Sequence, residues 1–342
     1  MKTDVGRQWT PDDVLELARS YQPAMLLAAA ADLDLFGALA KGPLSAEVVA
    51  RELDCDLRGL TTLLDALTAL RLLDKQNERY SLPAGLASCL TADGEQSVLA
   101  MTQHQANCLR RWAQLARVVK TGRPAERTPS VRGKRGDLAA FIGAMDNVSA
   151  PHASEVIRAI QPLQFKHVLD VGGASGTWTM AFLRACPAAT ATLFDLPQVI
   201  PLAQRRLADA GLAGVVRLVA GDFMTDPLPP GADLAWVSAI VHQNSREQNR
   251  QLFVKVLESL TPGGRIAIRD ILMDPTRTRP VAGALFAVNM LVGTERGGTF
   301  TFDELRQDLE AVGFVHPAVA RRDEGMNSVV VAGKPDRKAG AI

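Results

Sequence analysis

The sequence predicts a two-part α/β protein, in which an all-helical, winged-helix-like region precedes a doubly wound parallel sheet. Three observations lead to this prediction. The chain has 342 residues, of which 47% are apolar, so it is long enough for two domains with substantial cores. Residues 12 to about 120 read as successive helices, and from residue 166 apolar strands alternate with amphipathic helices. The predicted parts are a first domain at 1–120, a linker and connecting helix at 121–160, and a second domain at 161–342.

Helical periodicity dominates the first part. Apolar residues recur at helical spacing from residue 12 to about 40, and Gly37 predicts a stop near the end of this run. Ser45 is a predicted N-cap for the next helix, and residues 57–76 form a third helical run. A short strand and turn at 77–86 then complete the layout of a winged helix, which also raises the hypothesis of a DNA-binding regulator.

The charge pattern argues against nucleic acid as a partner. The helix expected at 57–73 would read DNA, yet it carries only Arg58 and Arg71 against Asp65. Groove reading needs contacts to phosphates and bases. The whole chain has 38 Lys and Arg against 37 Asp and Glu, which predicts neither a nucleic acid nor an anionic membrane as a partner. An apolar packing or dimerisation surface is the favoured interpretation of this region.

Composition also bears on the compartment. The N-terminus lacks the apolar core of a signal peptide, and Asp32 and Asp34 interrupt the apolar run at 23–40, so it is too short and too charged to span a bilayer. The four cysteines are scattered without metal-ligand or redox spacing. These features predict a cytoplasmic protein with free thiols and no metal. Residues 121–137, rich in Pro, Gly and Arg, predict a connecting loop before a return to helix.

The second part predicts a sheet with a functional edge. Strands are expected at 167–171, 189–196, 215–222, 232–241, 264–272 and 327–335, with helices between most of them. Ligands of doubly wound sheets bind at the carboxyl ends of the strands. We therefore expect Gly172, Asp195, Asp222, His242 and Asp270 to lie along one edge of one sheet.

The segment LDVGGASG predicts a tight glycine turn between a strand and a helix. The dinucleotide pattern G-x-G-x-x-G fails, because Ala174 and Thr177 stand where its second and third glycines would follow Gly172. Asp170, just before the glycines, would repel a pyrophosphate but can anchor an ammonium group.

Acidic residues follow the next two strands as well. Asp195 can accept both hydroxyls of a ribose, Asp222 can accept an adenine amine, and Phe223 can cover the face of the adenine ring. For any one of these acids, an N-cap or surface role is the more ordinary interpretation. Acids at three successive strand ends together indicate a nucleoside that carries an amino acid, and S-adenosylmethionine (SAM) fits this description.

The strings VLDVGGASGTW, FDLPQVI, AGDFMTDPLP, LTPGGRIAIRDIL and GFVHPAVA resemble class I methyltransferases of the caffeic acid and hydroxyindole (acetylserotonin) O-methyltransferase type. The resemblance runs from about residue 20 to 333. It implies a Rossmann-like methyltransferase sheet, a winged-helix-like dimerisation domain, a homodimer, SAM as cofactor and a small hydroxylated, aromatic substrate. The cofactor-binding residues then expected are Asp170, Gly172, Gly173, Asp195, Leu196, Asp222, Phe223 and Ser238. Plant members often carry Lys or Arg where this chain has Ser238 or Ala239.

The resemblance also implies a catalytic histidine. Family members usually have His-Asp-Trp after the fourth strand, whereas this chain has His242, Gln243 and Asn244. Asp270 and Glu295 match the two supporting acids of the family. A phenol with a pKa of ~10 is a poor nucleophile at neutral pH, and an imidazole with a pKa of ~6.5 can accept its proton during attack. The alternative is that the histidine merely caps the helix that starts near residue 245.

Four residues are expected to contact the substrate. Phe141 and Met145 lie in FIGAMDNVS, which resembles a Phe-x-x-Ala-Met stretch of the family, although both residues could equally belong to a core. Asn289 matches an asparagine that contacts substrate in the hydroxyindole branch. Trp112 is expected to close the pocket from the N-terminal domain.

The predicted function is SAM-dependent O-methylation of a small metabolite with His242 as general base. N-methylation of a similar scaffold is one alternative. The altered His-Gln-Asn stretch keeps open a second alternative, in which the fold binds SAM but catalyses hydroxylation, decarboxylation or a pericyclic reaction.

Overall fold

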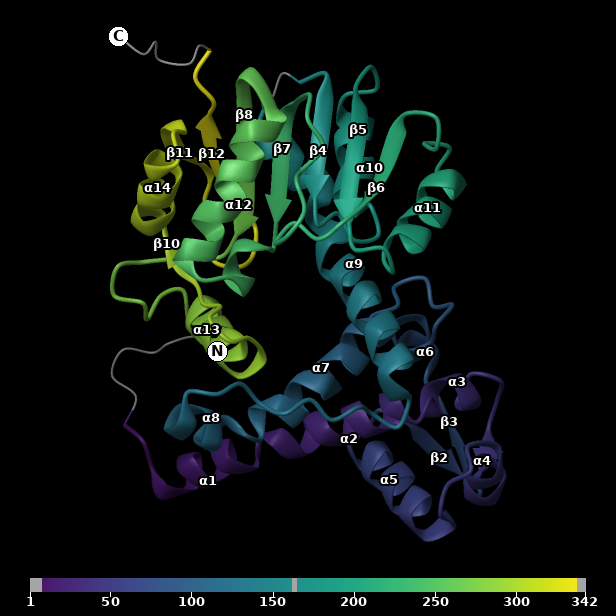
Figure 1. Cartoon of the computed structure of the whole chain (residues 1–342). Helices are drawn as coiled ribbons and strands as arrows, with labels where there is room; N and C mark the ends of the chain where they lie inside the picture. The colour runs from purple at the N-terminus through teal and green to yellow at the C-terminus, as the bar shows by residue number, and fades with distance from the viewer. Residues whose placement is uncertain (1–7, 162–164, 337–342) are drawn as a thin grey trace. The chain divides into compact units, whose positions relative to one another are not determined.

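The computed structural model describes residues 8–161 and 165–336, which fall into two compact units (Figure 1). The first unit comprises Met1–Arg110 and Arg127–Ala144, and the second comprises Arg111–Glu126 and Met145–Ile342. These boundaries differ from those expected from the sequence, because the segment between the two main regions is shared. Within it, the backbone N–H of Ala125 donates to the carbonyl of Val292 at 3.0 Å, whereas the Arg132 guanidinium pairs with Asp32.

The first unit has the winged-helix layout that the sequence predicts. Its three-stranded sheet has the order β1-β3-β2, and Phe36, Leu64 and Tyr80 are fully buried in its core. The elements that begin in this unit are α1 (Pro11–Arg19), α2 (Tyr21–Asp32), α3 (Leu35–Leu39), β1 (Leu44–Ser45), α4 (Ala46–Glu52), α5 (Leu57–Ala69), β2 (Asp74–Gln76), β3 (Arg79–Ser81), α6 (Ala84–Leu90), α7 (Leu99–Trp112) and α9 (Gly133–Ala159). The last two helices continue into the second unit.

The second unit is built on a seven-stranded sheet with the order β11-β12-β8-β7-β4-β5-β6. Its strands are β4 (His167–Val171), β5 (Thr190–Asp195), β6 (Val216–Ala220), β7 (Ala232–Ser238), β8 (Leu260–Asp270), β11 (Val315–Arg321) and β12 (Ser328–Gly333), and a parallel pair is formed by β9 (Leu272–Met273) and β10 (Phe300–Thr301). Its further helices are α8 (Leu115–Thr121), α10 (Thr177–Ala185), α11 (Ile200–Asp209), the 3₁₀ turn η1 (Val241–Gln243), α12 (Arg246–Ser259), α13 (Val281–Gly293) and α14 (Phe302–Ala311).

The sheet is mixed rather than entirely parallel, which corrects the sequence-based expectation. Strands β6, β5, β4, β7 and β8 are parallel, but β12 is antiparallel to both β8 and β11. The reason is the short connection between β11 and β12, which permits only an antiparallel hairpin. Strand β11 was not predicted from the sequence, since it contains Pro317, a residue that sheets tolerate mainly at an edge such as this one.

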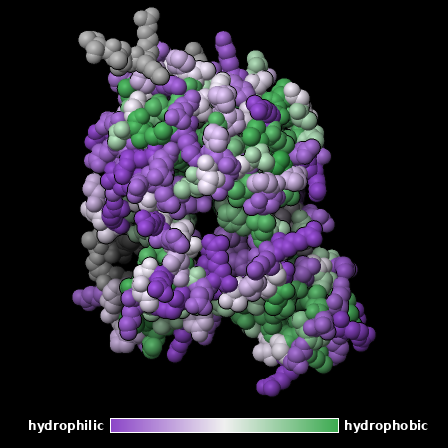
Figure 2. Space-filling model, viewed as in Figure 1, coloured by the Kyte–Doolittle hydropathy of each residue, from purple (hydrophilic) through white to green (hydrophobic). Residues whose placement is uncertain are grey.

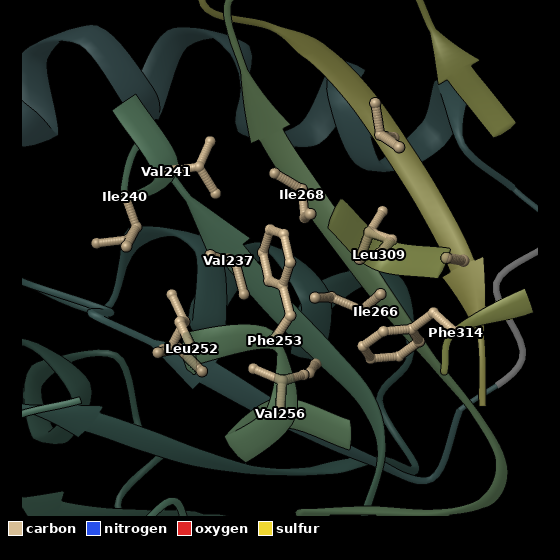
Figure 3. Close-up of a cluster of buried hydrophobic side chains, with 14 of the residues drawn as sticks. Val237, Ile240, Val241, Leu252, Phe253, Val256, Ile266, Ile268, Leu309 and Phe314 are labelled. Carbon is tan, nitrogen blue, oxygen red and sulfur yellow. The ribbon is translucent and has the colours of Figure 1, made fainter. Parts of the chain in front are cut away.

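Each face of this sheet is covered by its own core. One core joins β7 and β8 to α12 and α14, with Phe253, Ile266 and Phe314 fully buried among its members (Figure 3). On the other face, α9 and α10 pack through a cluster that contains Trp178 and Trp236. Burial of apolar surface on both faces is the main stabilising contribution, at about 25 cal/mol per Å². The two cores therefore hold the carboxyl ends of the central strands in fixed positions.

Further features of the described residues concern the cysteines, the hydropathy of the helices and the surface. All four cysteines are free. Among residues 8–161 and 165–336, no helix combines the length and apolar character needed to cross a membrane, and no group of three His, Cys, Asp or Glu side chains is arranged to hold a metal. On the viewed face, hydrophobic residues lie in separate patches among hydrophilic ones (Figure 2).

Candidate active site at the carboxyl edge of the sheet

The polar residues singled out in the second unit gather at one edge of its sheet. Asp195 and Asp270 are the last residues of β5 and β8, and Gly172, Asp222 and His242 follow β4, β6 and β7 closely in sequence. These five strands are parallel neighbours, so their carboxyl ends lie side by side. The expectation of a common edge is confirmed.

The glycine turn after β4 is tightly enclosed. Gly172 has φ +68°, and a Cβ atom at this position would lie 2.7 Å from Cδ1 of Ile240. A Cβ on Gly173 would lie 2.6 Å from Cγ of Leu193. Gly172 is therefore favoured by its positive φ, whereas a side chain at position 173 would displace the buried Leu193.

The carboxylate of Asp195 is held by backbone donors. Its Oδ2 accepts the N–H of Ala174 at 2.7 Å and its Oδ1 accepts the N–H of Leu196 at 2.7 Å. Burial raises the pKa of Asp195 in spite of these two bonds. Each oxygen keeps a free lone pair, so the carboxylate can accept two further hydrogen bonds. Two hydroxyl donors on adjacent carbons, as in a ribose, fit this arrangement.

Asp170 is the second acid at the turn, and it is almost fully buried. Its Oδ2 accepts the backbone N–H of Thr179 at 3.1 Å and the Thr179 hydroxyl at 2.6 Å. Within the described part of the chain, no donor reaches its Oδ1. Burial raises the pKa of Asp170 to about 7, an effect that Thr179 opposes and the charge of Asp195 reinforces. A cationic ammonium group beside Oδ1 would favour the ionised form, so the turn fits an amino acid moiety.

Asp170→Asn should alter the pH dependence of stability in the cofactor-free protein. A buried carboxyl with a raised pKa binds a proton in the folded state at pH values where the unfolded chain has lost it. The wild type should therefore lose stability, relative to the variant, as pH rises from about 4 to about 7. The amide oxygen of Asn can still accept both bonds from Thr179. We expect similar melting temperatures at pH 4.5 and a Tm several degrees higher for the variant at pH 8, measured by calorimetry; parallel curves would contradict the assignment.

The turn after β6 lies close to the glycine turn. Phe223 is half-buried, and its Cε1 atom lies 3.8 Å from where a Cβ of Gly172 would stand. Asp222 Oδ1 accepts the N–H of Met224 at 2.8 Å. Lys255 of α12 donates to the carbonyls of Phe223 and Met224 at 2.9 and 2.8 Å, a contact that no sequence motif indicated. Lys255 and the Asp222 carboxylate thus hold the backbone of this turn.

The hydroxyl of Ser238 is already bound by a buried arginine. Its hydroxyl accepts a hydrogen bond from Nη1 of Arg269 at 3.1 Å, and this guanidinium lies 4.7 Å from the ring centroid of Trp178. Burial lowers the pKa of Arg269 to about 10. No sequence motif indicated that a guanidinium occupies this buried position.

His242 lies in the 3₁₀ turn η1 and is buried. Its Nδ1 is 2.9 Å from Oδ2 and 3.0 Å from Oδ1 of Asp270. The ring of Phe286 stands edge-on at a centroid distance of 4.8 Å and an interplanar angle of 88°. The Nε2 atom has no hydrogen-bond partner among the residues that the structure describes. The imidazole is therefore fixed at one nitrogen and free to accept a proton at the other.

Two further expectations concern His242: that Glu295 is its second supporting acid, and, as the alternative to catalysis, that His242 caps a helix. Glu295 is exposed, and no hydrogen bond among the described residues joins it to His242. The helix-capping interpretation of His242 is wrong, because Ser245 is the N-cap of α12 and forms a capping box with Gln248. Gln243 is exposed and donates to the carbonyl of Ala239 at 2.9 Å.

The residues predicted to contact substrate divide between the two units. Trp112 belongs to the second unit, not to the N-terminal domain as expected, and its indole N–H donates to Oδ1 of Asn289 at 3.0 Å. Asn289 lies one helical turn after Phe286, so both project from one face of α13. Phe141 is an exposed residue of the first unit, and Met145 is a half-buried residue of the second.

Comparisons with known proteins match this organisation. Residues 15–93 match the family model of the O-methyltransferase dimerisation domain, and residues 114–315 match the O-methyltransferase domain. The chain is 31% identical to 3-hydroxy-5-methyl-1-naphthoate 3-O-methyltransferase of Streptomyces sahachiroi, over 95% of each chain. It is 30% identical to the N,N-dimethyltransferase OxyT of Streptomyces rimosus, over 94% of this chain and 96% of that one.

A solved structure shares the fold. PigF with SAH matches with a TM-score of 0.83 at 25% sequence identity, covering 95% of this chain and 100% of PigF. The two family models match in this order, and the relatives align over nearly the full length of the chain. These matches identify the family. The chain belongs to the S-adenosylmethionine-dependent O-methyltransferases, with an O-methyltransferase dimerisation domain ahead of the methyltransferase domain.

Proposed function

We propose that this enzyme methylates a hydroxyl group of a small aromatic metabolite, with His242 as the general base and Asp270 as the acid that orients it. The observation that carries the proposal is the Nδ1 contact of His242 with both oxygens of Asp270, at the same sheet edge as the glycine turn and Asp195. An imidazole with one nitrogen bound to a carboxylate and the other free is arranged to accept a proton.

The chemistry of this pair follows from the hydrogen bond. Asp270 can only accept when ionised, so it favours the tautomer of His242 with the proton on Nδ1 and the lone pair on Nε2. Nε2 then takes the proton of the substrate hydroxyl as the oxygen attacks. The imidazolium that results is stabilised by the carboxylate, as in other histidine–carboxylate pairs. SAM, when bound, supplies a methyl group activated by its sulfonium.

The cofactor would be held by residues at the ends of four strands, β4, β5, β6 and β7. Asp195 would accept the ribose hydroxyls, and Oδ1 of Asp170 would accept the ammonium group. Phe223 would cover the adenine and Asp222 would accept its amine. Gly172 and Gly173 would allow the cofactor to approach the backbone, while Leu196 and Ser238 would line the same edge. The free acceptor atoms described above support this assignment, because each has a donor on the cofactor to match it.

An aromatic substrate is supported by the wall that α13 forms beside the base. Phe286 lies edge-on to His242, and Asn289 projects from the same face of α13. The indole of Trp112 occupies Oδ1 of Asn289, so Nδ2 of this amide is left to donate to a polar atom of the substrate. Met145 and Phe141 are proposed as further contacts from α9. The relative from Streptomyces sahachiroi is named for a hydroxynaphthoate, which has the same chemical character.

N-methylation is the second candidate, favoured by the similarity to OxyT, which is named an N,N-dimethyltransferase. An amine that is neutral at the pH of reaction already has its lone pair, so it needs no base before attack. Incubation of the purified protein with SAM and matched libraries of phenols, hydroxyheterocycles and aryl amines would decide between them. We expect phenolic products heavier by one methylene group, with S-adenosylhomocysteine (SAH), the cofactor without its methyl group, released in equal amount. Turnover of amines alone would contradict O-methylation.

We also expect a homodimer through the N-terminal helices. Helix α1 buries none of its residues, and the surface formed by Val14, Leu17, Tyr21 and Met25 is 45–57% exposed at helical spacing. Such an exposed apolar stripe is typical of an interface. Leu17→Glu combined with Tyr21→Lys should halve the mass measured by light scattering at micromolar concentration. Glu16→Ala, an exposed polar position on the same helix, serves as the control. A wild type of monomer mass would contradict the prediction.

A further inference from the structure

We propose that the side-chain amide of Asn249 is a clamp that sets the position of the His242 imidazole, so that Asn249 is a positioning residue of the reaction. The inference rests on the proposed role of His242 as the base. Asn249 would act on the backbone beside His242 and not on the imidazole itself.

The clamp acts on the peptide bond just before the histidine. Asn249 lies in the first turn of α12, and its side chain has no exposed surface. Its Nδ2 donates to the carbonyl of Val241 at 2.9 Å, and that carbonyl belongs to the peptide group that joins Val241 to His242. Its Oδ1 accepts a hydrogen bond from Nδ2 of Asn244 at 3.1 Å, and Asn244 is also buried. The amide of Asn249 is therefore fixed at both of its ends.

The peptide bond after the histidine is held by a separate contact. The backbone N–H of Gly298 donates to the carbonyl of His242 at 2.9 Å. The chain passes so close here that a Cβ on Gly297 would lie 2.5 Å from the same carbonyl oxygen. Together with Asn249, these contacts hold the peptide groups on both sides of the base.

Among the other backbone contacts of this segment, the N–H of Gln243 donates to the carbonyl of Ile240 at 2.9 Å, and two others are longer. The 3₁₀ turn spans only three residues, and the N–H of Asn244 reaches the carbonyl of Val241 at 3.3 Å. The N–H of His242 reaches Oδ2 of Asp270 at 3.4 Å. Hydrogen bonds weaken at such lengths. Without the Asn249 amide, the Val241 carbonyl keeps, among the described residues, only the 3.3 Å bond from Asn244. The peptide group just before the base then loses its short bond to α12.

The placement of an amide in this core needs a reason of its own. A buried amide costs free energy unless its polar atoms are paired, and here the neighbouring Leu252 and Phe253 of α12 are buried apolar residues. An apolar side chain at position 249 would suit that core but could not bind the Val241 carbonyl. Asn244, which stands where the His-Asp-Trp pattern has tryptophan, is the partner of Asn249 in this pair.

The catalytic consequence is geometric. A general base must come within about 2.6–3.2 Å of the proton donor, and a displacement of about 1 Å can lower the rate about 100-fold. Asn249→Ala should therefore lower kcat by about 10- to 100-fold. The affinity for SAH, measured by calorimetry, and the KM for substrate should stay within about threefold, because Asn249 contacts no proposed cofactor residue.

Gln248→Ala provides the matched control. Gln248 is the neighbouring residue of the same helix turn, and its side chain accepts the N–H of Ser245 in the capping box. Its loss should weaken the capping box at the start of α12 without touching the peptide bonds of His242. Asn249→Ser is made alongside, since a small hydroxyl can bond within its own helix and preserve folding if the alanine variant folds poorly.

The outcomes separate the clamp from a structural role. A fall in kcat for Asn249→Ala and Asn249→Ser but not for Gln248→Ala, with SAH affinity retained, supports the clamp. Equal kcat for the Asn249 and Gln248 variants, whatever their melting temperatures, overturns it. His242→Ala is measured in parallel: if this variant keeps wild-type kcat, both the base assignment and the clamp fail, whereas a loss in His242→Ala alone overturns only the clamp.

Discussion

His242→Ala should lower turnover by about 10²–10⁴-fold, which is the usual contribution of a general base. The variant should still bind SAH with nearly wild-type affinity, because the His242 side chain is not among the proposed cofactor contacts. The melting temperature should change little, since α12 keeps its own cap at Ser245. Turnover and melting temperature measured on one preparation will test this; a kcat within threefold of the wild type would contradict the assignment.

The pH dependence of this loss gives a second test. A substrate hydroxyl that is already ionised needs no base, so the difference between His242→Ala and the wild type should shrink as pH approaches the pKa of the substrate hydroxyl. The relevant measurement is kcat for both proteins from pH 6 to 10. A constant ratio across this range would mean that His242 acts through something other than proton transfer.

The two acids proposed around the base can be distinguished in the same assay. Asp270→Asn would present an amide N–H₂ or an oxygen to Nδ1 and would no longer favour the productive tautomer, so we expect a loss comparable to that of His242→Ala. Glu295→Gln should leave kcat nearly unchanged, because Glu295 is exposed and makes no hydrogen bond to His242 in the described chain. The reverse pattern would assign the orienting role to Glu295.

The positions of the strand ends could be predicted from the sequence because local chemistry marks them. An apolar run followed by glycine or aspartate signals both the end of a buried strand and the start of a polar turn, as at Gly172 and Asp195. Parallel order then brings these ends together without any knowledge of side-chain contacts. The orientation of β12 could not be obtained in this way, since its apolar run reads alike for either direction.

Contacts between residues far apart in the chain could not be predicted from the sequence, for a different reason. Trp112 and Asn289 are 177 positions apart, and nothing in the local pattern of either indicates that the tryptophan joins the second unit. The same holds for Lys255, whose position on α12 reads as an ordinary surface lysine although its ammonium group binds the carbonyls of Phe223 and Met224. The pairing of Asn244 with Asn249 is also invisible to periodicity, because polar residues at the start of a helix usually face solvent.

Asp195→Ala should weaken SAH binding by at least about 2 kcal/mol, or roughly 30-fold, as expected for the loss of hydrogen bonds to a charged group. Calorimetric titration of the wild type and the variant measures this directly. Ribose hydroxyls that bind the carboxylate would favour its ionised form and lower the pKa that burial has raised. Wild-type affinity should therefore rise with pH through the range in which the free carboxyl titrates, and the variant should lack this contribution.

The loss of affinity alone would not prove contact with the ribose, because Asp195 also holds the glycine turn through the N–H groups of Ala174 and Leu196. A double-mutant cycle with the 2′-deoxy analogue of SAH separates the two effects. If the carboxylate binds the hydroxyl, the analogue should bind the wild type much more weakly than SAH does, yet bind Asp195→Ala almost as well as SAH does. Equal losses on removal of the hydroxyl in both proteins would mean that Asp195 shapes the turn without touching the ribose.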